Sequence, residues 1–67
     1  MNYVYMIALN ELVPDLTTRR GNRHWMRVVA PDRDSAKREA KESARRRSGI
    51  ELRDEDIVSV RGGTRPA

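Results

Sequence analysis

The chain has 67 residues, a formal net charge of +4 and no cysteine, and 36% of its residues are charged. A chain this short forms at most one small domain, and the absence of cysteine excludes disulfides and thiolate zinc sites. No apolar run approaches membrane-spanning length, so we expect a cytoplasmic protein without a membrane partner.

The N-terminal part of the chain predicts a strand over residues 2–9, since tyrosine, valine and isoleucine favour pleated, half-buried surfaces. Nearly every position in it is apolar, which is typical of a central strand covered on both faces. Residues 10–22 follow as a long connection without a clear period, containing Pro14 and Gly21, and we expect a loop there.

Residues 23–30 predict a second strand that ends at Pro31. Alternation along it puts Met26, Val28 and Ala30 on one face, and Trp25, Arg27 and Val29 on the other.

A helix is predicted from Asp32 to about residue 48, because Asp32 is a good N-cap and Gly49 suits the left-handed position after a helix end. Ala36, Ala40 and Ala44 are spaced by four residues, so they form one face of small side chains.

The last predicted strand covers residues 57–61, and residues 62–67 are expected to form a flexible C-terminal tail beyond a domain of residues 1–61. The fold class is therefore α+β, a small ββαβ (split β-α-β) domain. The helical crossover makes the second and third strands parallel, so the third lies beside the first in a three-stranded sheet of order 2-1-3. One helix packs on one face.

The other face of this sheet has no cover within the chain. The first strand turns either its odd-numbered or its even-numbered residues to that face. We expect the odd-numbered set, with its tyrosines, because large rings are awkward beneath the alanine face of the helix. The predicted interface consists of Tyr3, Tyr5, Trp25 and Arg27, with Arg61 as a further candidate. Such a surface suits either base stacking or burial in a homodimer.

The middle of the chain is strongly basic. From residue 19 to residue 47 there are eleven basic and four acidic residues, a net charge of +7. Clustered cations bind nucleic-acid phosphates, although a solvated helix face partly neutralised by Glu39 and Glu42 explains the same pattern. The predicted nucleic-acid-binding residues are Arg19, Arg20, Arg23, Lys37, Arg38, Lys41, Arg45, Arg46 and Arg47.

No catalytic or metal-binding constellation is recognisable. The acidic turn formed by Glu51, Asp54, Glu55 and Asp56 does not have the spacing of a calcium-binding loop. His24 has no nucleophile or carboxylate at a signature spacing. We therefore predict no enzyme activity, no cofactor, no metal and no small-molecule substrate.

The stretch from Val28 to Ala36, continued to Ala40, is similar to the strand-to-helix junction of many small α/β modules. The archaeal LX-type ribosomal proteins resemble the chain in the order of strand, cap, alanine-rich helix, glycine, turn and strand, over about half of its length. The resemblance implies a supersecondary order alone. The turn is acidic here and basic in that family, so no binding residues are transferred.

These observations predict a small binding protein whose basic loop and helix engage nucleic acid, either DNA or RNA. The alternative is a protein-interaction module, either a homodimer through its open sheet face or a modulator of a host protein encoded by a phage. Short, arginine-rich chains without motifs resemble orphan proteins of phages of GC-rich bacteria.

Overall fold

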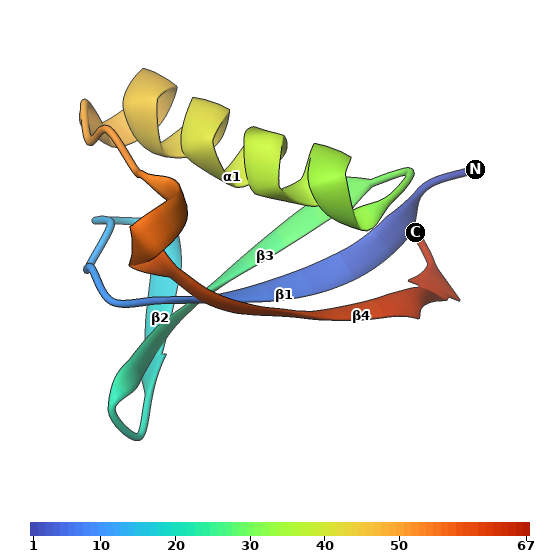
Figure 1. The fold of residues 1–67 in the computed structure, drawn as a ribbon, viewed down its shortest axis with the longest axis horizontal. Helices are drawn as coiled ribbons and strands as arrows, with labels where there is room; N and C mark the ends of the chain where they lie inside the picture. The colour runs from blue at the N-terminus through green and yellow to red at the C-terminus, as the bar shows by residue number, and fades with distance from the viewer.

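A computed structural model describes residues 1–67 and shows one α-helix lying across one face of a four-stranded antiparallel sheet (Figure 1). The α+β class is confirmed, whereas the prediction of three strands is wrong. The elements are β1 (Tyr3–Leu9), β2 (Thr17–Arg20), β3 (Arg23–Ala30), α1 (Arg33–Ser48), a 3-10 turn η1 (Asp54–Asp56) and β4 (Ile57–Pro66).

The unpredicted strand, β2, lies inside the connection that was expected to be a loop. Its four residues pair antiparallel with β3, from Thr17 opposite Met26 to Arg20 opposite Arg23. Gly21 and Asn22 form the two-residue turn between them, and Gly21 has a φ of 61°. A positive φ at the first turn position matches the twist of a hairpin, so the turn allows β2 to fold back and pair with β3.

The sheet has the order β2-β3-β1-β4, so the apolar strand β1 lies between β3 and β4. β4 is longer than predicted and continues from residue 61 to Pro66, which pairs with Tyr3. Gly62 and Gly63 have φ values of 97° and 88°, and the β1–β4 register shifts beside them. The two glycines therefore let β4 bulge and continue where the sequence suggested a tail.

α1 begins where predicted. The backbone N–H of Ser35 donates to Asp32 Oδ1 at 2.8 Å, which lowers the pKa of Asp32 below its ordinary value. At the other end Gly49 adopts a φ of 66°, and its N–H reaches the carbonyl oxygens of Ala44 and Arg45. No helix in the structure has the length and apolar character needed to cross a membrane.

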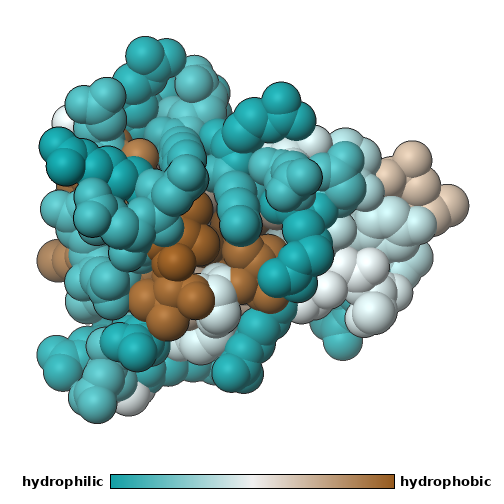
Figure 2. All heavy atoms as spheres, in the orientation of Figure 1, coloured by the Kyte–Doolittle hydropathy of each residue, from teal (hydrophilic) through white to brown (hydrophobic).

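The core lies between α1 and the sheet, where Ala36, Ala40 and Ala44 are fully buried. Larger side chains from the sheet and from the connection after β1 fill the space beneath these alanines, among them Ile7, Leu9 and Val13. Figure 2 shows hydrophilic atoms over the helix and a band of apolar atoms reaching the surface between helix and sheet.

The face of β1 that was assigned to solvent is in fact the core face. Tyr5 is 5% exposed and belongs to the core together with Ile7, and Tyr3 packs against them. We expected large rings to be awkward beneath an alanine face. Instead Gly63, on the neighbouring strand, makes room, because a Cβ there would lie 2.7 Å from Tyr5 Cε1. The placement of Tyr3 and Tyr5 in an outward interface is therefore wrong.

Candidate functional site on the open sheet face

The open face is the side of the sheet that α1 does not cover. Residues directly opposite in antiparallel strands share a face, so the pairing of Met6 with both Arg27 and Arg61, and of Ala8 with Trp25, defines it. Its members by register are Val4, Met6, Ala8, Thr18, Arg20, Arg23, Trp25, Arg27, Val29, Ser59 and Arg61.

The open face is positively charged without local compensation. None of the four strands contains an aspartate or glutamate. Four arginines of this face are exposed and none of them forms an ion pair. They are Arg20, Arg23, Arg27 and Arg61. Four free guanidinium groups on one surface produce a local field that attracts anions.

Trp25 lies among these arginines. The residue opposite it on β1, Ala8, is only 1% exposed on a face that no helix covers, so the Trp25 ring is in position to cover it. The Arg61 guanidinium carbon lies 5.4 Å from the centroid of the Trp25 ring, within the range of a cation–π contact. Met6, Arg20, Trp25 and Arg61 line an open hollow of about 370 Å³.

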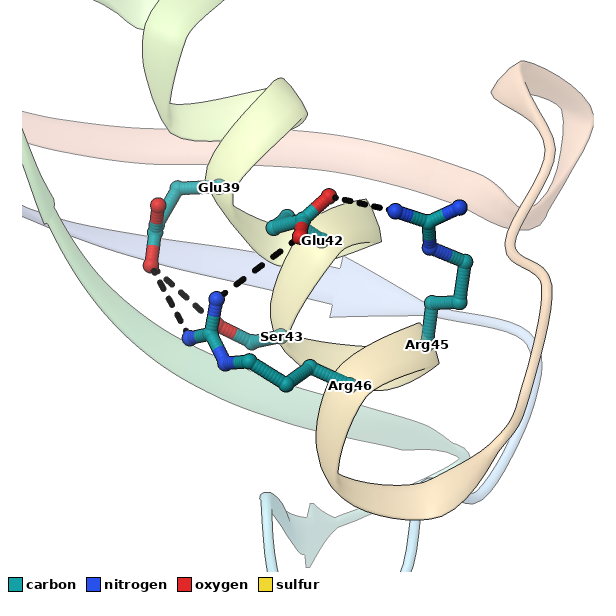
Figure 3. Close-up of polar contacts among 5 residues, drawn as sticks. All are labelled: Glu39, Glu42, Ser43, Arg45 and Arg46. Carbon is teal, nitrogen blue, oxygen red and sulfur yellow. Dashed lines mark hydrogen bonds and ion pairs between the residues drawn. The ribbon is translucent and has the colours of Figure 1, made fainter.

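The helix cations have a different environment, shown in Figure 3. Arg46 reaches Glu39 at 4.0 Å and Glu42 at 3.8 Å, and Arg45 reaches Glu42 at 3.3 Å. Lys41 pairs with Asp54, and the hydrogen bond from Lys41 lowers the pKa of this carboxyl. These ion pairs neutralise part of the charge that the sequence assigned to nucleic-acid binding.

The predicted nucleic-acid-binding residues therefore do not form one surface. Arg20 and Arg23 lie on the open face, whereas Arg19 pairs with His24 on the opposite side of the hairpin. The remaining six lie on α1, in the other layer of the molecule. They are Lys37, Arg38, Lys41, Arg45, Arg46 and Arg47.

The predicted sheet interface is likewise divided. Trp25 and Arg27 do lie on the open face, but Tyr3 and Tyr5 belong to the core side. Met6 lies beside Trp25 and was missed, because the wrong face of β1 was chosen. The available signal for the correct face is Gly63, which leaves room for the Tyr5 ring on the core side.

The acidic turn serves a structural role. Asp56 accepts a hydrogen bond from the Arg53 backbone N–H at 2.9 Å, and the Asn10 N–H donates to the Asp56 carbonyl oxygen at 3.0 Å. Together with the Lys41–Asp54 pair, these contacts fasten the turn to the helix and to the end of β1. The turn thus uses its carboxylates and carbonyls within the fold.

No protein-family model matches the chain, and comparison with curated proteins and with solved structures gives no significant match. Any function must therefore be argued from the residues of the open face and the helix themselves.

Proposed function

We propose that this chain is a small, non-enzymatic, cytoplasmic nucleic-acid-binding protein whose contact surface is the open face together with the β2–β3 hairpin. The observation that carries the proposal is the group of four exposed arginines around Trp25, none of which forms an ion pair. Arginine without a carboxylate partner keeps its planar donor fork available for phosphate.

The distribution of acids supports this choice of surface. All acidic residues lie outside the strands, on the helix, its flanks and the connecting segments. A polyanion approaching the sheet therefore meets no carboxylate within the strands, whereas one approaching α1 meets Asp34, Glu39 and Glu42 among the cations. Binding at the sheet avoids that repulsion and releases counterions from the nucleic acid.

The helix remains the second candidate for the same function, as the sequence predicted. Arg33, Arg38 and Arg47 are exposed there and form no ion pair. They offer a matched comparison with the open face, because the same number of charges can be removed from each surface.

A homodimer through the open face is the competing interpretation, and the charges argue against it. A twofold interface brings the same patch of both copies together. Arg20, Arg23, Arg27 and Arg61 of one copy then face the same residues of the other without any carboxylate between them. An anionic partner is the better match for this surface.

The test is a titration of end-labelled DNA and RNA oligonucleotides, followed by fluorescence anisotropy at low salt, with two triple variants. Arg20→Gln/Arg23→Gln/Arg27→Gln changes the open face, and Arg33→Gln/Arg38→Gln/Arg47→Gln changes the helix. We expect the open-face variant to lose roughly tenfold or more in affinity. Its plot of log affinity against log salt should become shallower by about 0.7–0.9 per lost phosphate contact.

The helix variant, which has the same net charge, should bind nearly as tightly as the parent chain. The reverse result would move the site to α1. Absence of any binding at low salt would end the proposal for both surfaces.

A further inference from the structure

We infer that the ligand of the open face is a single strand of nucleic acid, one of whose bases stacks against the Trp25–Arg61 pair. This inference rests on the proposed function and names the class of nucleic acid. The phosphate contacts alone would suit a duplex equally well, so the choice between them depends on the aromatic centre of the face.

Trp25 is placed as a stacking platform. It is partly exposed on the open face, and the residues directly opposite it, Ala8 on β1 and Thr18 on β2, have small side chains. Bases in a duplex are already stacked and cannot lie flat on such a ring, whereas an unpaired base can. Covering Ala8 needs only an apolar side chain, whereas a partly exposed indole also offers a planar face to a base.

Arg61 strengthens the platform. The Cα of Arg61 lies opposite that of Met6 on β1, and its guanidinium carbon lies 5.4 Å from the centroid of the Trp25 ring. A planar guanidinium stacked over an indole can receive a base on its outer side or give way to it, and in both cases the base meets a flat, polarised partner. The hollow lined by Met6, Arg20, Trp25 and Arg61 is the space into which the base enters.

The two arginines of β3 nearest Trp25 lie on either side of it. Arg23, Trp25 and Arg27 alternate along β3 and leave the same face, so each arginine starts about 6.5–7 Å from Trp25 and the two arginines start about 13–14 Å apart. A base stacked on Trp25 therefore has a cation on each side of it along β3. These two cations are in position to meet phosphates of the same strand on either side of that base.

The experiment uses the emission of Trp25, the only tryptophan in the chain, as a direct reporter of the site. Three probes of equal length, about ten nucleotides, are compared at one salt concentration: an oligothymidylate, its abasic counterpart and a duplex. We expect the oligothymidylate to bind most tightly and to change the emission of Trp25. The abasic strand and the duplex should bind more weakly and leave the emission unaltered.

Two variants test the stack itself. Trp25→Leu keeps an apolar cover over Ala8 but removes the indole ring. Arg61→Lys keeps the positive charge but removes the planar guanidinium. Each should reduce affinity for the oligothymidylate, by roughly five- to hundredfold for Trp25→Leu, and should reduce affinity for the abasic strand by a clearly smaller factor. Circular dichroism melts check that both variants fold. If Trp25→Leu does not fold, Arg61→Lys alone provides the test.

Equal affinity for all three probes, with unchanged emission and no effect of either variant, would overturn the inference and leave the proposed function standing. Failure of every probe to bind at low salt would overturn both.

Discussion

Single residues decide which side of the sheet becomes the core. Gly63 has a φ of 88°, and a Cβ at this position would lie 2.7 Å from Tyr5 Cε1. Gly62 is equally constrained, since its Cβ would lie 2.6 Å from the carbonyl oxygen of Val4. Gly63 thus leaves room for the Tyr5 ring on the core side, whereas Gly62 lets the backbone of β4 lie close to that of β1. With Tyr5 on the core side, alternation leaves Met6 and Ala8 on the open face.

Gly63→Ala should destabilise the fold by about 1–3 kcal/mol, because the substitution adds backbone strain to a steric overlap with the Tyr5 ring. Gly21→Ala is the matched control. Gly21 also has a positive φ, 61°, but a Cβ added there would have no other atom within 4 Å. Urea unfolding of both variants should show the larger loss for Gly63→Ala, and equal losses would mean that backbone strain alone matters.

Asp32 should make the helix sensitive to acid. The Ser35 N–H lowers the pKa of Asp32, so the folded state favours the ionised carboxyl and the cap contributes stability at neutral pH. That contribution is lost as the pH falls from the ordinary pKa of 3.8 through the lowered value in the folded protein. Over this acidic range the melting temperature should fall less for Asp32→Asn than for the parent chain, because asparagine caps the helix without titrating.

If the melting temperature falls equally steeply with pH in the parent chain and in Asp32→Asn, other carboxyls dominate acid unfolding. Asp54 is the first to consider, because Lys41 lowers its pKa in the same direction.

At the level of elements, α1 approaches the sheet closely because its inner face consists of alanines. Ala40 lies at the middle of this face and is fully buried. Ala40→Leu should therefore destabilise by about 1–3 kcal/mol through overpacking. Arg38→Leu places the same side chain on an exposed helical position and should have little effect on the thermal midpoint; similar midpoints for the two variants would contradict the packing described.

The elements with strong local signals were the predictable ones. β3 and α1 lie where alternation, Pro31, Asp32 and Gly49 placed them. β2 was missed because its residues, Thr-Thr-Arg-Arg, are mostly exposed and show no apolar alternation, so only pairing with β3 makes them a strand. The turn residues Gly21-Asn22 were the available signal.

The candidate site was predictable only in part, for a related reason. The alternation of β3 predicts Trp25 and Arg27 on the open face, because one face of this strand is apolar from Met26 onward and the other contains arginines. β1 has no such contrast, since both of its faces carry apolar residues, and a choice of register there inverts every side chain. Its face is determined by contacts with β4 that are distant in sequence.

For the whole molecule, the segregation of charge predicts the state of association. The open face has arginines and no acid, so two copies repel each other there, and we expect a monomer in light scattering after size exclusion at low salt. Nuclease treatment beforehand removes bound nucleic acid that would bridge two copies. A dimer that persists in both low and high salt would assign the open face to self-association instead.

The two outer strands of the sheet have a consequence for the protein at high concentration. β2 is only four residues long and ends in two arginines, while β4 is interrupted by its glycine bulge and ends at Pro66. Neither offers the long, flat row of free backbone groups on which a neighbouring chain could add a strand. We therefore expect the folded protein to resist growth into fibrils through its sheet edges. The small core gives a small free energy of unfolding, so this protection by the edges matters more than it would in a larger domain.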